Sequence, residues 1–242
     1  MSTNELDIVK ATGGFALFWG VIFILLQNLI MPRFKAWRSL IEWQRIEAIM
    51  RIVAVLNGLV VFVAGIVTLL HPVNEPRNYI WWSLSCTVGY WVYDLIGNIY
   101  YYALLKKSFV LIHHCFSIFC GVFFQFYGVM HMGAIAMTGG PSSDIIDHSV
   151  WFAQRLGHLR NRKYLVHVFD TIFFGVMRLL LTNYLYLTIL PVDQAFWQQP
   201  NFVRNVCYGL ICFFVILNSW IFYKHFARLL RYTRHHQQQK QE

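Results

Sequence analysis

The sequence predicts an all-α membrane protein in which seven transmembrane helices form one bundle. Composition is the first observation: 57% of the 242 residues are hydrophobic and only 13% are charged, whereas a soluble domain carries about a quarter charged residues. The second is that apolar stretches of about 20 residues, long enough for a helix to cross a bilayer, recur along the whole chain. The third is that the net charge of +9 comes from basic residues clustered between these stretches, which indicates membrane topology rather than a nucleic-acid-binding surface.

Seven stretches are candidates for the membrane-spanning helices. In chain order they cover residues 12–31, 51–70, 79–105, 108–127, 130–152, 164–190 and 202–226. In the segment 32–50, tryptophans and aliphatic residues alternate with arginines and a lysine, which predicts an amphipathic helix in the membrane interface. We therefore expect an N-terminal segment with the first helix in 1–31, the interfacial helix in 32–50, a six-helix bundle in 51–228 and a basic polar tail in 229–242.

The distribution of lysine and arginine supports this number of crossings. Nearly all of them fall in four clusters, at 33–51, 106–107, 155–163 and 224–240. Cytoplasmic loops of membrane proteins carry an excess of these residues. Seven crossings place all four clusters on the cytoplasmic side, whereas omitting one crossing would place two of them on the wrong side.

Ionisable residues inside the predicted spans are the strongest functional signal. A charged residue at the centre of a transmembrane helix costs about 2.5–3.5 kcal/mol on insertion scales, so such residues pair with each other or line a polar cavity. A rise of 1.5 Å per residue places most of them in one layer within the cytoplasmic half of the membrane, with Arg178 near mid-membrane. We expect a polar chamber that opens toward the cytoplasm and is lined by these residues: Asp94, Asp144, Asp147, Asp170, Arg178, His113, His114, His148 and His167.

Helical spacing predicts the faces that line this chamber. Tyr90, Asp94 and Asn98 share one face of the third span, and Asp170 and Arg178 share one face of the sixth. A buried arginine is suited to binding a carboxylate or a phosphate through two parallel hydrogen bonds.

Structural roles for these residues remain open. Polar side chains such as the two histidines can simply connect helices by hydrogen bonds. Asp94 can pair with Arg178, and Asp170 with a histidine. We expect no metal site, because adjacent histidines point about 100° apart on a helix and chelate one ion poorly.

Four motifs, in order, resemble the TLC-domain family of ceramide-synthase-like membrane proteins over roughly residues 43–228. They are GYWVYD at 89–94, LIHH at 111–114, FFGVMR at 173–178 and LNSW at 217–220. The resemblance implies a TLC-type bundle in the endoplasmic reticulum membrane, with a mitochondrial or other organelle membrane as the alternative. Two positions depart from the family: Ala54 and Asn57 stand where a serine and a histidine are frequent. The segment 143–147 also keeps two aspartates but lacks the histidine found before them in ceramide synthases.

The first functional hypothesis is a lipid N- or O-acyltransferase. His113 or His114 would act as nucleophile or general base, with Asp144 or Asp147 orienting the imidazole. Fatty acyl-CoA would be the co-substrate, and no bound cofactor or metal is expected. The substrate-binding residues would be Asp94, Asp170, Arg178, Asn98 and Tyr90.

The second hypothesis is a protein without catalytic activity. The same chamber would hold a membrane lipid, or the chain would be a structural or accessory subunit with protein partners in a larger membrane complex. Neither hypothesis involves nucleic acid. Native mass spectrometry of the purified protein would separate the two. Co-purifying acyl-CoA or an acylated histidine supports the first, and a bound phospholipid or a stoichiometric protein partner supports the second.

Overall fold

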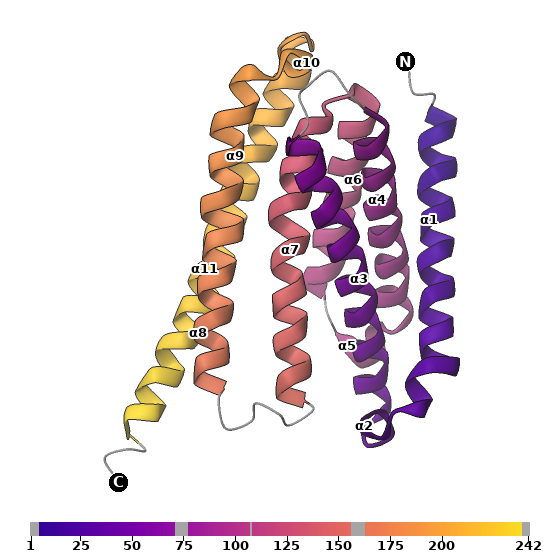
Figure 1. Cartoon of the computed structure of the whole chain (residues 1–242), viewed down its shortest axis with the longest axis vertical. Coiled ribbons are helices and arrows are strands. Elements are labelled where there is room, and N and C mark those ends of the chain that lie inside the picture. Colours follow the sequence, from indigo (N-terminus) through magenta and orange to yellow (C-terminus); the bar gives the residue numbers. More distant parts are fainter. Residues whose placement is uncertain (1–4, 71–76, 107, 156–162, 239–242) are drawn as a thin grey trace.

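The computed structural model describes residues 5–70, 77–106, 108–155 and 163–238, and every regular element within these ranges is a helix (Figure 1). Helices largely cover all seven predicted stretches. The elements are α1 (Glu5–Leu25), η1 (Leu26–Ile30), η2 (Met31–Arg33), α2 (Lys35–Arg38), α3 (Glu42–Leu70), α4 (Arg77–Tyr100), α5 (Tyr102–Leu105), α6 (Ser108–Tyr127), α7 (Met130–Arg155), α8 (Lys163–Phe174), η4 (Gly175–Leu181), α9 (Thr182–Ile189), η5 (Leu190–Val192), α10 (Gln194–Trp197) and α11 (Asn201–Gln238).

The long helices run side by side along the long axis of the molecule (Figure 1). Helix α3 packs against α7 at the centre, α4 packs against α6, and α1 covers α4 at one edge. At the opposite edge, α8, η4 and α9 form one long helical rod beside α11 (Figure 1). Helix α1 begins at the end of the bundle opposite to that at which α11 finishes (Figure 1).

Among the described residues, five helical segments are long and apolar enough to cross a membrane: Glu5–Arg33, Glu42–Val67, Ser108–Tyr127, Leu165–Val192 and Asn201–Arg231. The chain is therefore a polytopic membrane protein. Helices α4 and α7 lie parallel to these segments but are less apolar, because they carry polar residues that face the interior, such as Asp94 and Thr138. That these two helices also cross the membrane stays a prediction.

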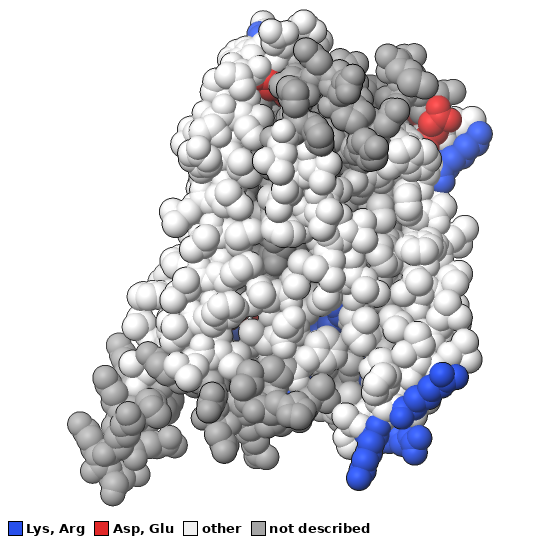
Figure 2. Space-filling view, in the orientation of Figure 1, with Lys and Arg blue, Asp and Glu red and all other residues white. Residues whose placement is uncertain are grey.

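The surface and the interior have the polarity expected in a bilayer. Leu17, Ile112 and Leu187 are 70–77% exposed, whereas Ser85 and Gln125 are fully buried. Gln125 donates a hydrogen bond to Ser85 Oγ at 2.5 Å and so satisfies part of its polarity inside the bundle. On the face shown in Figure 2, a broad band of almost entirely uncharged surface covers the middle of the molecule, and lysines and arginines gather at the end where α2 joins α1 to α3.

The segment 32–50 differs from the predicted single amphipathic helix. Pro32 belongs to the short turn η2, and Phe34 is extended, with φ −87° and ψ 129°. Helix α2 covers only Lys35–Arg38, and α3 begins at Glu42. The physical reason is burial: Ile46 and Ile49, in the second half of this segment, are 5% and 0% exposed inside the bundle. These apolar residues therefore extend the transmembrane helix α3.

A close contact fixes α1 against α4. A Cβ atom at Gly89 would lie 2.5 Å from Cβ of Phe15 and 2.8 Å from the carbonyl oxygen of Thr12. Only glycine permits the two backbones to approach this closely. On the same face, Trp19 Nε1 donates a hydrogen bond to the Cys86 carbonyl oxygen at 3.2 Å. This contact holds the face of α4 that carries Asp94 in a fixed position.

Candidate functional site

A polar chamber of about 400 Å³ lies among α3, α4, α6, α7, the α8–η4 rod and α11. It lies in the half of the bundle nearest α2. Six helical segments supply its walls. The polar residues that line it are Arg51, Tyr90, Asp94, Asn98, His113, His114, Asp147, His148, Arg178, His225 and Arg228.

A buried aspartate and histidine meet in this chamber. Oδ2 of Asp94 lies 2.8 Å from Nε2 of His114, and it also accepts a hydrogen bond from Nδ2 of Asn98 at 2.8 Å. Asp94 and Asn98 stand one helical turn apart on α4, as their spacing predicted. All three residues are less than 8% exposed. Asp94 therefore orients the imidazole of His114, and its carboxylate is engaged by His114 and Asn98 rather than by Arg178.

The second ring nitrogen of His114 is buried, and no described group lies within hydrogen-bond distance of it. Because the Asp94 carboxylate accepts the proton of Nε2, the neutral ring carries its lone pair on Nδ1. Nδ1 of His114 is therefore an acceptor that no donor among the described residues occupies.

The neighbouring histidine points in a different direction. The His113 ring stacks on Phe109, with 6.4 Å between centroids and 6° between planes, and its centroid lies 5.5 Å from that of His114. The divergence of the two rings follows from their adjacent positions on a helix.

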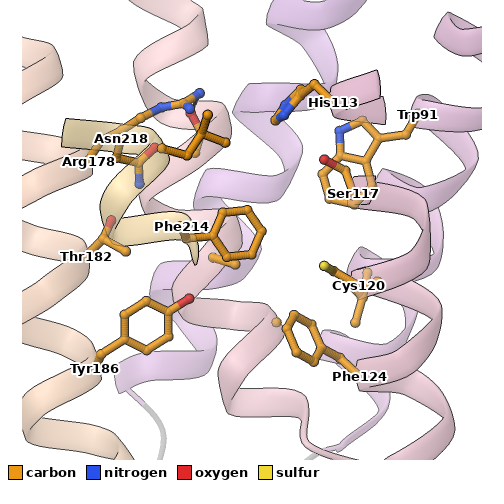
Figure 3. A pocket seen from close by; sticks show the side chains of 16 residues that line it. Trp91, His113, Ser117, Cys120, Phe124, Arg178, Thr182, Tyr186, Phe214 and Asn218 are labelled. Atoms are coloured by element: carbon orange, nitrogen blue, oxygen red, sulfur yellow. Dashed lines mark hydrogen bonds between the residues drawn. The ribbon is translucent and has the colours of Figure 1, made fainter. Parts of the chain in front are cut away.

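A narrow and mainly apolar cavity, called the slot here, adjoins the chamber. Its volume is about 70 Å³, and it shares Trp91, His113 and Arg178 with the chamber. From His113 it extends along α6 past Cys120 to Phe124 (Figure 3). His113 faces Arg178 and Asn218 across this cavity (Figure 3). The histidine therefore stands where a polar compartment meets an apolar one.

Arg178 lies at this junction because of an irregularity in the helix. Its side chain is 9% exposed, donates a hydrogen bond to the Gly140 carbonyl oxygen at 3.1 Å and lies over the Phe174 ring. Arg178 belongs to a stripe of residues at every fourth position, and all four members are buried: Asp170, Phe174, Arg178 and Thr182. The π turns of η4 take more residues than α turns and so keep the stripe on one face.

Asp170 is paired with a histidine, as one of the sequence alternatives proposed. Nδ1 of His225 lies 3.0 Å from Oδ2 of Asp170, and the His225 ring stacks on Phe174 with 4.8 Å between centroids. Sequence reasoning assigned position 225 only to a basic cluster.

Arg51 organises the part of the chamber nearest α2. Its guanidinium bonds Glu47 Oε1 at 2.9 Å and His148 Nδ1 at 2.8 Å, and it lies 3.6 Å from Asp147. Arg51 entered the sequence analysis only as a topology signal, although the i,i+4 spacing of Glu47 and Arg51 indicates a pair. Asp147 thus contacts Arg51 and His148 rather than the histidine pair.

Three predicted positions stand apart from this arrangement. Asp170 contacts the lining residue His225 but does not itself line the chamber. The side chain of Asp144 lies outside the described residues. His167 is buried on α8 but does not line the chamber. Within the described ranges, no three His, Cys, Asp or Glu side chains are grouped so that they could hold a metal ion.

The family model of the TLC domain (TRAM/LAG1/CLN8) matches residues 47–227. The chain belongs to the TLC-domain family. The matched range runs from α3 into α11, so that the TLC domain contains the Asp94–His114 pair, His113 and the slot. Helices α1 and α2 precede the TLC domain. No curated protein and no solved structure matches the chain significantly.

Proposed function

We propose that this TLC-domain protein binds a fatty acyl chain in the slot and transfers it from acyl-CoA to an amine or hydroxyl group of a membrane lipid. The observation that carries the proposal is the position of His113 at the junction of chamber and slot, beside the oriented His114. An amphiphile needs such a divided site, because its apolar and polar parts require different surroundings.

The chemistry follows from the two differently placed imidazoles. His113 attacks the thioester carbonyl carbon, so that a carbon–nitrogen bond forms, the carbon–sulfur bond breaks, and CoA leaves as a thiol after taking up the proton that the acylated His113 ring releases. The acceptor amine or hydroxyl then attacks the acyl-imidazole, the carbon–nitrogen bond to His113 breaks, and the acceptor's proton returns to the departing His113 ring by way of His114. The acyl group ends on the lipid, and His113 is regenerated.

Other chamber residues support these steps. Asp94 holds the proton on Nε2 of His114 and stabilises the imidazolium that forms. Arg178 and Asn218 face His113 and are placed to stabilise the negative oxygen of the tetrahedral intermediate (Figure 3). Arg51 and Arg228 line the chamber and would attract the phosphates of CoA.

The proposal includes seven crossings, with the chamber on the cytoplasmic side of the endoplasmic reticulum membrane. An odd number of crossings is consistent with helices α1 and α11 beginning and finishing at opposite ends of the bundle (Figure 1). The basic residues at the α2 end support a cytoplasmic location of that end (Figure 2). Acyl-CoA would then enter from the aqueous side where the chamber lies.

The proposal is tested with purified full-length protein, labelled acyl-CoA and a panel of lipid amines and alcohols. His113→Ala and His114→Ala should each lose acyl transfer, whereas Cys115→Ala, at an exposed position on the same helix, should retain it. Mass spectrometry of His114→Ala should detect an acyl group on His113, because the second step is slowed. Full transfer by the His113→Ala/His114→Ala double variant contradicts the enzyme proposal.

A second candidate function is binding of a membrane lipid without catalysis, alone or as a subunit of a membrane complex. The observation in its favour is that Ala54 lines the chamber at a position where the resemblance implies a polar residue. Native mass spectrometry of the purified protein separates the two candidates. A bound phospholipid or a stoichiometric protein partner, with no acyl adduct formed from acyl-CoA, supports the second.

A further inference from the structure

A second cavity of about 410 Å³ lies where α1 passes through α2 into α3. It shares no residue with the chamber or the slot. Most of its walls precede residue 47, where the match to the TLC domain begins. The cavity is therefore built mainly by the part of the chain that lies outside the TLC domain, and it is independent of the proposed function.

Two arginines face this cavity without a carboxylate partner among the described residues. Arg38 Nε donates to the Pro32 carbonyl oxygen at 3.1 Å, and Arg45 donates through one Nη to the Arg38 carbonyl oxygen at 3.0 Å. Nε of Arg45 is buried, and no described acceptor lies within hydrogen-bond distance. The backbone bonds hold both guanidinium groups in place and leave donors that suit a phosphate.

The surroundings of the cavity place it at a membrane surface. Its inner wall is apolar and includes Trp37 and Ile49, which are 6% and 0% exposed. In the neighbouring chain segments, Ile24, Leu29 and Phe34 are 55–57% exposed. A molecule with a phosphate in the cavity could therefore lay hydrocarbon chains along α1.

We propose that this cavity binds the phosphate of an anionic membrane phospholipid between Arg38 and Arg45. Gln27 and Asn28, on η1, line the cavity and can donate to the remaining headgroup oxygens, although Asn28 Nδ2 already donates one hydrogen bond to the Ile24 carbonyl oxygen at 3.0 Å. Glu42 also lines the cavity and opposes the binding of an anion. The two arginines outnumber this carboxylate, and the basic end of the molecule adds attraction to anionic lipid (Figure 2).

The test uses native mass spectrometry of the full-length protein, titrated with phosphatidic acid, phosphatidylcholine or inorganic phosphate. Phosphatidic acid should bind more tightly than phosphatidylcholine, and inorganic phosphate should compete only weakly because it lacks the chains that contact α1. The Arg38→Gln/Arg45→Gln variant should weaken phosphatidic acid binding by at least about tenfold. The matched variant Arg33→Gln/Lys35→Gln removes the same charge from the same segment but not from the cavity, and should change binding by less than about twofold.

Two further variants keep the test decisive if loss of the arginines disturbs folding. Gln27→Phe fills the cavity from η1 while both arginines are kept, and it should also weaken binding. Glu42→Gln should strengthen it. If the Arg38→Gln/Arg45→Gln and Arg33→Gln/Lys35→Gln variants lose the same affinity for phosphatidic acid, the lipid is attracted diffusely by the basic segment. If Glu42→Gln binds more weakly, the cavity recognises a cationic headgroup. Competition by inorganic phosphate at the affinity of the lipid would mean a soluble anion, and each of these three results overturns the proposal.

Discussion

Nε2 of His114 and Oδ2 of Asp94 lie 2.8 Å apart, although the residues belong to different helices and both are nearly inaccessible to solvent. The pair fixes the orientation of one imidazole and leaves His113 directed to the junction of the chamber and the slot. Its energetic and chemical roles can be separated by substitution.

Asp94→Asn is predicted to keep the shape of the pair and to remove its charge. The amide no longer holds the proton on Nε2 of His114, so transfer should fall by about 10²–10⁴-fold, the range for loss of assisted proton transfer. Stability should fall by about 1–3 kcal/mol, because buried hydrogen bonds become imperfect. Turnover and thermal unfolding of the purified variant measure both effects. Unchanged turnover would show that His114 works without orientation by Asp94.

Cys120→Phe is predicted to shorten the slot. Cys120 is 2% exposed and lies on the slot wall beyond His113. An aromatic ring there would occupy space needed by the far end of an acyl chain, so the profile of transferred or co-purified chains should shift toward shorter ones. Lipid mass spectrometry measures the profile. Cys115→Phe, on the exposed face of α6, is the control, and an equal shift in both variants would argue against an acyl chain in the slot.

Arg51→Gln is predicted to destabilise the part of the chamber nearest α2. The Glu47 side chain, 7% exposed, loses the guanidinium that contacts it at 2.9 Å. Removing one partner of a buried ion pair costs about 3–5 kcal/mol. The double variant Glu47→Gln/Arg51→Gln should recover most of the loss, because no buried charge remains in that pair. Thermal unfolding of both single variants and of the double variant measures these losses of stability. If the loss in the double variant equals the sum of the two single losses, Glu47 and Arg51 do not interact significantly.

Gly89→Ala is predicted to loosen α1 from α4. The added methyl group would overlap Phe15 and the backbone of α1, and overpacking of this kind costs about 1–3 kcal/mol. Gly13→Ala is the matched change on α1 itself, where a Cβ meets no atom within 4 Å. It should stabilise the helix by about 0.5–1 kcal/mol. The unfolding temperature should fall in Gly89→Ala and rise in Gly13→Ala. If it falls in both variants, the loss in Gly89→Ala cannot be assigned to the close contact between α1 and α4.

The sequence predicts the helices and their inward faces well because both depend on local patterns. Apolar length locates the helices, and helical spacing finds the buried stripes that carry Asp94 and Arg178. The resemblance to the TLC-domain family is confirmed by the match over residues 47–227.

Partners on different helices are harder to predict, because they depend on how far one helix is displaced along another. This explains why the sequence left the partner of Asp94 open and did not single out His225. The prediction of one amphipathic helix over residues 32–50 was wrong for a related reason. An amphipathic pattern describes two faces but not what covers the apolar one, and in this chain the bundle covers Ile46 and Ile49.

Photo-crosslinking with a fatty acyl-CoA that carries a diazirine at the end of its chain tests the central claim most directly. If the acyl chain enters the slot with its thioester at His113, illumination should label peptides that contain Phe124 or Tyr186, and excess unlabelled acyl-CoA should abolish the labelling. Labelling confined to the lipid-facing residues of α1 and the outer face of α6, without competition, would contradict the account.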